Sequence, residues 1–537
     1  MRTVTSGALR NPPTLDRPPP GYRLSGNQAI AIASRLSKVR DARRGHRGSY
    51  VNVFEKGSRM WQVSFFAPPR REIAQVLLLD SSGRVTEAWT GFQVAWTMAR
   101  GYPGAFGRKV NALYVWLPLC VLFALPFVDP RKLRRMIHLD LLMLSLLSVS
   151  LAFFNHADIA ASVPLSYPPL LYLLGRMLWI GLHRGAPAPE PLCLLVPVSW
   201  LTVGLVFLVG FRVGLNMVDS NVIDVGYASV VGANQITSGK PIYGHFPNDI
   251  SQGDTYGPAA YGAYVPFREL FGFKGRWDDL PAAHAAAVAF DLICIVLMIL
   301  IGRRLRGPPL GWVLGYTWAA FPFTLFTLES NSNDSLVAVL VLGAILLAAR
   351  APARGVLGAL AGLTKFAPFA LAPLLATHDL GRHPVRRLAA FVIAFAGAAA
   401  LTLYPALAHG GSLQTLYTRT IAYQSGRGSP FSLWGLYGGL GWVQAAVQVL
   451  AVALALVVAA IPRRADVVGL AALAAAITIS LQLGLTHWFY LYIVWFFPLV
   501  MIALLARAPL TGPQLRAPLQ SRPRTEPGSP SSAPALP

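Results

Sequence analysis

Residues 282–302 spell AAHAAAVAFDLICIVLMILIG, an apolar run that contains one carboxylate, Asp291. Apolar runs of about 18 residues or more are long enough to cross a bilayer as a helix. Similar runs follow one another from residue 111 onward, at 111–128, 138–154, 165–182, 191–211, 310–328, 332–349, 388–407, 437–460, 467–486 and 487–506. The sequence therefore predicts an all-α polytopic membrane protein with about 11–12 transmembrane helices.

The composition supports a membrane location and argues against nucleic-acid binding. Of the 537 residues, 54% are hydrophobic and 13% are charged, whereas soluble proteins carry about 25% charged residues. The net charge is +23, and the basic residues lie in short links between apolar runs and in the two terminal segments, which is the pattern of the positive-inside rule. The three cysteines, Cys120, Cys193 and Cys294, lie far apart in apolar runs, so neither a disulfide framework nor a metal cluster is expected.

The basic links also predict the topology. They lie at residues 131–135, 303–306, 350–354, 382–387, 463–464 and 507. All of them can be cytoplasmic only if the interrupted apolar interval 355–377 enters and leaves the membrane on the same side. We therefore favour a re-entrant hairpin, broken near Lys365 and Pro368, over a plain spanning helix. The outward segments are then 212–281, 329–331, 408–436 and the junction at 486/487.

The first part of the chain has a different composition. Residues 1–108 are basic and mostly polar, and we expect a small α+β module with a disordered start. Residues 27–39 have helical spacing, and two strand-rich stretches follow, with a turn at DSSG, residues 80–83. The segment from Val76 to Val85 resembles PepSY-like domains. Helix parity predicts that the module lies outside, although its positive charge favours the opposite side.

Beyond this module, three further segments are expected. Residues 109–190 should form three extra transmembrane helices, and residues 191–507 should form a core with a long outer loop at 212–281. Residues 508–537 have the composition of a disordered tail.

The outer loop holds the residues that first suggest chemistry. Asp219 and Asp224 follow a membrane helix, and turn-forming segments with aromatic residues follow at 239–243 and 256–258. Such segments suit a compact, ordered loop. A solvated loop would also contain acids and tyrosines, so the loop by itself leaves its role open.

Four segments together resemble a known enzyme superfamily. Asp224-x-x-Tyr227 followed by Gly239-x-Pro241-x-Tyr243 and Tyr256-x-Pro258 resembles the first outer loop of GT-C glycosyltransferases. The similarity is greatest to glycosyltransferase family 87 and to actinobacterial mannosyltransferase-like membrane proteins. The segments ESNSND at 329–334, GLTKFAP at 362–368 and RGSPFSLWG at 427–435 are similar to three further stretches of these enzymes. The last is the most specific, and the resemblance covers roughly residues 190–505.

The resemblance implies roles for individual residues. An acidic residue at the start of the outer loop acts as the base on the acceptor in this superfamily, so Asp224 is the first candidate and Asp219 the second. Lys365, Arg427, His487, Asn331, Asn333 and Tyr256 are the candidates for binding substrate and the lipid phosphate. Each basic residue also has a simpler interpretation: a snorkelling Lys365, a surface Arg427, and a His487 in an aromatic interface belt. Asp291 fits either a cation partner or a helix-packing contact.

The function expected from the resemblance is transfer of a hexose, mannose first, or of a pentose from a polyprenyl-phosphate donor. The acceptor would be a hydroxyl of a glycan or glycolipid at the outer face of the cytoplasmic membrane, with inversion of configuration. No cofactor or nucleic-acid partner is expected, no metal ligands are assigned, and a divalent metal is not excluded. The alternative is a transporter or flippase of lipid-linked sugars, which predicts charges throughout the bilayer depth and matching halves. No internal repeat is found.

Overall fold

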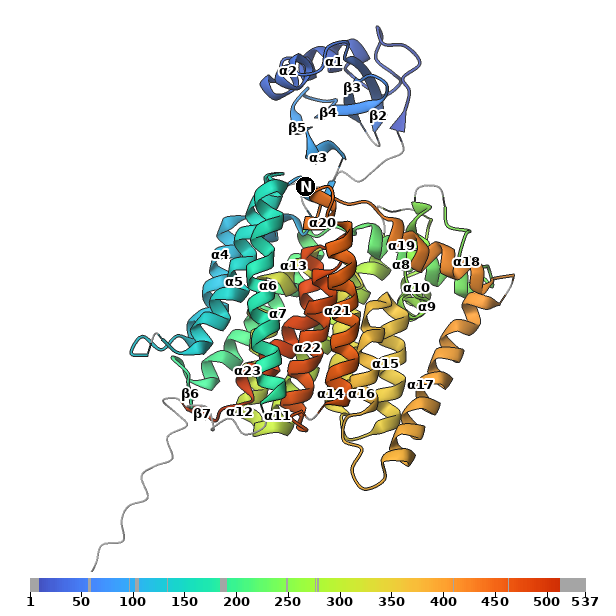
Figure 1. Cartoon of the computed structure of the whole chain (residues 1–537). Helices are drawn as coiled ribbons and strands as arrows, with labels where there is room; N and C mark the ends of the chain where they lie inside the picture. The colour runs from blue at the N-terminus through green and yellow to red at the C-terminus, as the bar shows by residue number, and fades with distance from the viewer. Residues whose placement is uncertain are drawn as a thin grey trace, which may run out of the picture.

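The computed structural model describes residues 9–511 except 57–58, 96, 102–105, 133, 184–190, 248–249, 276, 278–279, 409 and 462. It contains a bundle of apolar helices and a small N-terminal α+β unit (Figure 1). The predicted fold class, an all-α polytopic membrane protein with an α+β N-terminal domain, is confirmed.

The N-terminal unit is an antiparallel sheet covered by two helices. The strands pair in the order β1 (Leu9–Arg10), β2 (Tyr50–Lys56), β3 (Met60–Ala67), β4 (Arg71–Leu79) and β5 (Val85–Thr90). The one helix expected over 27–39 is instead two, α1 (Gly26–Ser34) and α2 (Ser37–Arg44), because Leu36 has extended backbone angles. The buried Asp80 carboxylate accepts hydrogen bonds from the backbone of Arg23 and Leu24 and from the Trp61 indole, which fastens the chain before α1 to the sheet.

Every apolar run contains a helix. In chain order these are α4 (Leu113–Ala124), α5 (Met136–Asn155), α6 (Ile159–Leu182), α7 (Val198–Asp219), α11 (Pro281–Arg306), α12 (Pro308–Ala320), α13 (Pro322–Glu329), α14 (Asp334–Leu346), α17 (Pro384–Leu407), α21 (Gly441–Ala460), α22 (Val467–Leu483) and α23 (Ile493–Leu505). Five of them, α5, α7, α11, α17 and α21, are long and apolar enough to span a membrane by length and composition alone. Others are shorter because proline divides a run, as between α12 and α13.

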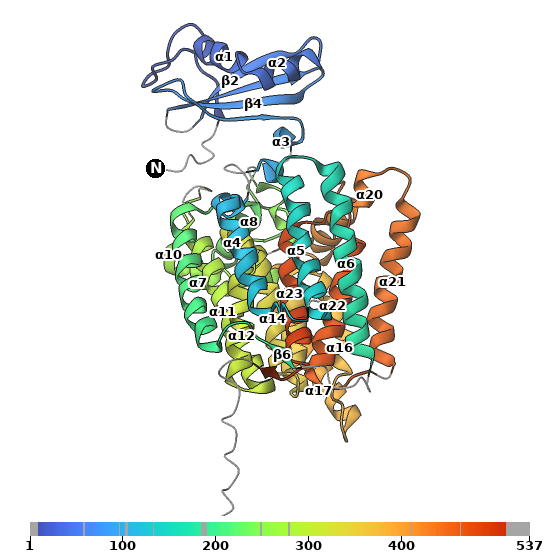
Figure 2. The ribbon, with the colours of Figure 1, turned by 90° about the vertical axis from the view of Figure 1, so that its left-hand side faces the viewer.

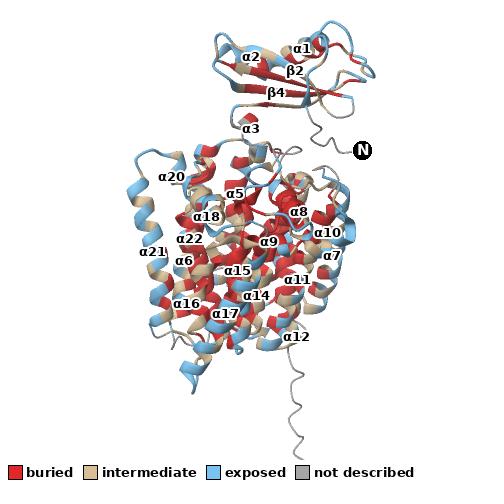
Figure 3. Ribbon diagram, turned by 90° about the vertical axis from the view of Figure 1, so that its right-hand side faces the viewer, coloured by how far each residue is buried: buried red, intermediate tan, exposed pale blue. Residues whose placement is uncertain are grey.

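The burial pattern separates peripheral from central helices. Trp200 in α7, Leu401 in α17 and Trp442 in α21 are 70%, 79% and 78% exposed, and Figure 3 shows long exposed stretches on α17 and α21. By contrast, nearly all of α22 and α23 is buried. Large apolar side chains on an exposed helix face are expected where lipid surrounds the protein. The central helices also carry polar contacts: the Tyr490 hydroxyl lies 2.7 Å from Ser150 Oγ and 2.8 Å from Ser162 Oγ, which joins α5 and α6 to the core.

The two ends of the bundle differ. One end, here called the basic end, carries the links α4–α5, α11–α12 and α21–α22 and the link from α14 to α15 (Ala351–Lys365). It also carries the parallel pair β6 (Leu192–Cys193) and β7 (Leu510–Thr511) (Figure 1). β7 lies within the predicted tail, whose residues after 511 are outside the described residues. The opposite end, called the loop end, carries α8 (Asp224–Thr237), α9 (Pro258–Gly262), α10 (Val265–Phe271), α18 (Leu413–Tyr417), α19 (Tyr423–Gly426) and α20 (Leu433–Leu436). The N-terminal unit lies beyond the loop end (Figure 2).

The interval 355–377 forms the predicted re-entrant hairpin. Helix α15 (Ala351–Lys365) leaves the basic end, and the chain returns through the 3-10 helix η6 (Ala367–Leu371) and α16 (Ala372–Ala376). At the basic end, the Arg354 guanidinium donates to the carbonyls of Leu375, at 2.8 Å, and His378, at 2.6 Å. Both ends of the hairpin are therefore held together, and Lys365 lies at its turn.

Cysteine labelling tests this topology. If the basic end is cytoplasmic, a membrane-impermeant maleimide should label Ser251→Cys at the loop end in intact cells, because Ser251 is exposed. The native Cys193 in β6 is also exposed and should react only after permeabilisation. Cys193→Ser provides the matched background, and labelling of Cys193 in intact cells would contradict the orientation.

Candidate active site

Asp224 is held at the first turn of α8 by the junction between α13 and α14. The backbone N–H of Asn221 donates to Glu329 O at 3.1 Å, and that of Ile223 donates to Ser330 O at 3.2 Å. Gly226 makes this contact possible, because a Cβ there would lie 2.3 Å from Asn331 O. The start of the outer loop is therefore packed against the helix junction.

Asn331 and Asn333 belong to that junction and are buried. The Asn331 amide donates to Ser220 Oγ and to Asn221 O, both at 3.0 Å, and the Asn333 amide donates to Ser229 Oγ at 3.1 Å. Both side chains thus position the segment around α8. The role in substrate binding expected from the sequence stays a prediction.

Lys365 is a buried cation with an internal partner. Its Nζ lies 2.9 Å from Asp334 Oδ1, and its side chain is 6% exposed. The rings of Tyr256, Tyr492 and Trp495 surround the ammonium group, with centroids 5.0, 5.7 and 5.7 Å from Nζ. An aromatic ring attracts a cation within about 6 Å of its centroid. Lys365 is therefore enclosed in the protein and does not snorkel.

Asp334 and Tyr492 are parts of this cluster that sequence reasoning missed. Asp334 opens α14, is fully buried, and accepts a second hydrogen bond from Trp495 Nε1 at 3.0 Å. Its Oδ2 has no hydrogen-bond partner among the described residues. A signal was available, because a charge within a membrane run requires a counter-charge, and Asp334 lies inside the apolar run 332–349, near its start.

Tyr256 reaches Lys365 because the outer loop packs directly on the end of α15. The Gly257 N–H donates to Thr364 O at 3.1 Å. A Cβ at Gly257 would lie 1.8 Å from Leu363 O, so only glycine allows this approach. Further out, Arg419 pairs with the buried Asp254 through two contacts of 2.7 Å, joining the outer loop to the segment after α17.

The segment 427–435 forms another part of the site. Ser429 Oγ lies 2.9 Å from His487 Nδ1. Ser432 Oγ donates to Thr486 O at 2.7 Å and also accepts from the backbone N–H of Gly435 at the start of α20. These contacts hold the segment against the junction between α22 and α23, and they place Arg427 near His487.

Electrostatic interactions connect these segments around Asp224. The Asp224 side chain is exposed, yet desolvation by the protein around it raises its pKa, while Arg427 and Lys365 act in the opposite direction. Burial, together with Arg427 and Lys365, lowers the pKa of His487 to about 3. Burial is also the main cause that raises the pKa of Tyr256, and Asp224 adds to it. The structure thus brings Asp224, Lys365, Arg427, His487 and Tyr256 into one cluster.

Asp219 has other partners. Its carboxylate lies 3.7 Å from Arg108 Nε and 3.9 Å from Lys109 Nζ, which belong to the linker after the N-terminal unit. The two aspartates are therefore separated by their environments: Asp224 interacts with Arg427 and Lys365, whereas Asp219 fastens the linker to α7.

Asp291 is the partner of a buried cation. Arg212 Nε donates to Asp291 Oδ2 at 3.0 Å, and Trp318 Nε1 donates to Oδ1 at 2.8 Å. This resolves the alternative that the sequence left open. Within the described part of the chain, no three His, Cys, Asp or Glu side chains are grouped as metal ligands.

Comparison with known proteins supports a glycosyltransferase. Residues 255–486 match the model of glycosyltransferase family 87. The matched stretch contains Tyr256, Lys365 and Arg427, whereas Asp224 and His487 lie outside it. No curated protein matches the chain. Together with the helical membrane fold, the match supports a membrane glycosyltransferase, which acts on a sugar donor and an acceptor at the bilayer.

The Lys365–Asp334 pair should be worth more to stability than an exposed pair. Removing one partner leaves a buried charge alone, at a cost of about 3–5 kcal/mol, whereas replacing both partners costs much less. We therefore expect Asp334→Asn and Lys365→Met each to lower the thermal unfolding temperature in detergent strongly. The double variant should lower it less. Glu269→Gln, which removes the partly exposed Arg268–Glu269 pair, is the control. Additive losses in the double variant would contradict the pairing.

The lowered pKa of His487 gives a pH dependence. The unfolded chain protonates this ring near its ordinary pKa of about 6.5, but the folded protein does so only near about 3. Stability is therefore lost as the pH falls from about 6.5 towards 3, by up to about 1.4 kcal/mol per pH unit. His487→Gln should lose less thermal stability than the wild type between about pH 7 and pH 4.5. The exposed His156 supplies the control His156→Gln, and equal losses in all three proteins would refute the assignment.

Proposed function

We propose that the protein transfers a sugar from a polyprenyl-phosphate donor to an acceptor hydroxyl of a glycan or glycolipid, at the extracytoplasmic face of the cell membrane. The observation that carries the proposal is the exposed carboxylate of Asp224 within the field of Lys365 and Arg427 at the loop end. One group of this cluster can accept a proton, and others can stabilise an anionic leaving group.

Asp224 is the proposed general base. A base must be accessible to the acceptor and have a pKa suited to accepting its proton. Asp224 is exposed, and desolvation by the protein raises its pKa. Asp219 is the weaker candidate, because Arg108 and Lys109 flank its carboxylate.

Arg427 is the proposed main cation for the lipid phosphate. The charge of Lys365 is balanced by Asp334, whereas Arg427 forms no ion pair within the described residues. The phosphate leaves as an anion, and guanidinium groups form strong charge-assisted hydrogen bonds with phosphate oxygens. His487 is neutral at physiological pH, since its pKa is about 3, so it can contribute a hydrogen bond without adding a charge. Tyr256 packs over Lys365 beside them.

The position of the cluster suits a lipid-linked donor. A polyprenyl chain stays in the bilayer and presents its phosphate at the membrane surface, where the loop end lies in the proposed orientation. One displacement at the anomeric carbon by the acceptor oxygen, with departure of the lipid phosphate, inverts the configuration. A hexose is expected, mannose first, with a pentose as the alternative.

The matched pair Asp224→Asn and Asp219→Asn tests the base. With membranes supplied with labelled polyprenyl-phosphate mannose, Asp224→Asn should reduce transfer about 10²–10⁴-fold, the usual contribution of a general base. Asp219→Asn should retain activity within several-fold. Equal activity of the Asp224 variant and the wild type, once transfer by the wild type is verified, would exclude this role.

The same assay separates transfer from transport. A flippase would move the labelled lipid across vesicle membranes without forming a glycosylated product. Product formation that depends on Asp224 and Arg427 supports the transferase. Lipid movement without product, unaffected by Asp224→Asn, would support the transporter instead.

A further inference from the structure

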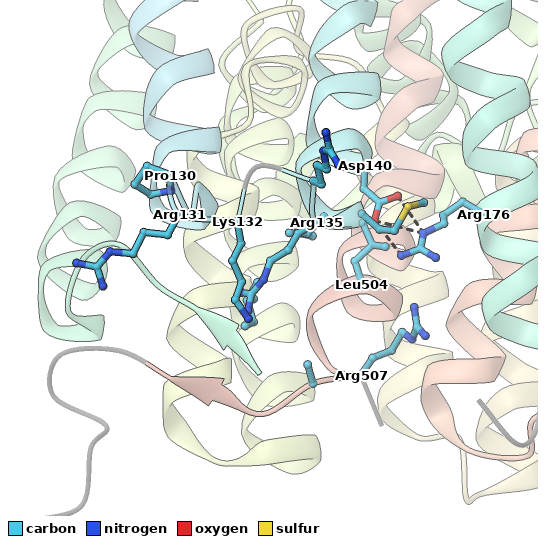
Figure 4. Close-up of a pocket in the computed structure, with 13 residues that line it drawn as sticks. Pro130, Arg131, Lys132, Arg135, Asp140, Arg176, Leu504 and Arg507 are labelled. Atoms are coloured by element: carbon cyan, nitrogen blue, oxygen red, sulfur yellow. Dashed lines mark hydrogen bonds and ion pairs between the residues drawn. The ribbon is translucent and has the colours of Figure 1, made fainter. Parts of the chain in front are cut away.

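A cavity of about 800 Å³ opens at the basic end, away from Asp224. It lies among the chain before α5, the facing sides of α5 and α6, strand β6 and the chain after α23 (Figure 4). Its lining therefore comes from an early part of the chain, residues 130–192, and from a late part, residues 504–508. None of these residues belongs to the proposed active site.

The lining of the cavity is strongly basic. Its lining contains one carboxylate, that of Asp140, and six basic side chains, which are Arg131, Lys132, Arg134, Arg135, Arg176 and Arg507. Asp140 is already engaged, since Arg176 Nε and Nη2 donate to its two oxygens at 3.0 and 3.2 Å, and the Tyr172 hydroxyl donates at 2.7 Å. Arg135 also pairs with Asp129, at 3.5 Å. The lining still carries more positive than negative charge when Asp129 is counted, so the cavity favours an anion.

Arg507 shows the need for a ligand most directly. It follows α23 by two residues, and its Nε is buried without a hydrogen-bond partner among the described residues. Burial, and then the charges of Arg176 and Arg464, lower the pKa of this guanidinium. A buried donor without a partner is costly. In Figure 4, Arg507 and Arg176 extend into the same region, whereas Arg131 points away from it.

Apolar side chains form the rest of the wall. Met136, Ile137, Leu192, Leu504 and Ala508 line the cavity beside the basic groups. Asp140 lies four residues into α5, about 6 Å along the helix axis, so the cavity extends from the end of α5 past its first helical turn. Such a mixed lining suits a ligand with an anionic head and an apolar body.

We propose that this cavity binds the phosphate group of an anionic phospholipid from the leaflet at the basic end. Arg507 contacts the phosphate, the exposed Lys132 adds positive charge to the cavity, the Arg176–Asp140 pair forms the floor, and Met136 and Leu504 contact the start of the acyl chains. Basic pockets between transmembrane helices on the cytoplasmic side are a known way to hold anionic lipid heads. The lipid joins α5, α6 and α23 at the end opposite to the proposed chemistry.

Lipid titration of the full-length protein in neutral detergent tests the proposal. Phosphatidylglycerol should raise the thermal unfolding midpoint with a saturable dependence and should remain bound in native mass spectrometry. Phosphatidylcholine and inorganic phosphate at the same concentrations should do neither. Stabilisation by inorganic phosphate equal to that by phosphatidylglycerol would overturn the lipid as the source of the phosphate, and no saturable effect of any of them would overturn the site.

A pair of double variants separates the cavity from general surface charge. Lys132→Gln/Arg507→Gln should weaken phosphatidylglycerol binding at least tenfold. Arg303→Gln/Arg382→Gln, which removes two exposed bases outside the cavity at the same end, should change it less than twofold. Equal weakening by both would overturn the proposal in favour of non-specific attraction. Because Lys132 is exposed, Lys132→Gln alone keeps the test valid if the double variant does not fold, and it should weaken binding several-fold.

Discussion

The ion pair between Lys365 and Asp334 is the contact on which the arrangement of the loop end depends. A re-entrant half-helix ends in the interior of the protein, and its terminal cation needs a counter-charge that does not come from water. Asp334 supplies it from the first turn of α14, while Trp495 of α23 binds the same oxygen. Three segments are thereby brought to one point, and the outer loop closes over them through Tyr256.

The residues around this pair are of two kinds. Some are exposed at the loop end, and others are buried and hold the exposed ones in position. Asn331 and Gly226 fasten the start of α8, and Ser429 and Ser432 fasten the segment that carries Arg427. Polar side chains at a membrane surface can thus be mostly structural. The exposed groups, Asp224 above all, are the ones available for chemistry.

The sequence predicted the helices and the re-entrant hairpin because hydropathy and the distribution of arginine are local properties of the chain. It also predicted that Asp224, Lys365, Arg427 and His487 lie together, through resemblance to a family. It did not predict that Lys365 pairs with Asp334, or that Asn331 is buried, because such partners depend on which helix ends meet in space. The break at Leu36 was missed for a related reason, since 27–39 has helical periodicity on both sides of it.

The hydrogen bonds of Tyr490 limit how much of this protein can be removed in a truncated or chimeric protein. Its hydroxyl lies between Ser150 of α5 and Ser162 of α6. Its neighbours along the chain, His487 and Tyr492, belong to the cluster around Lys365. The stretch that matches the family begins only at residue 255, well after those serines. A truncated or chimeric protein that starts at the core would leave this phenol buried beside missing helices. Helices α5 and α6 therefore pack against the segment that carries Tyr490 and His487, and grafting experiments should keep them.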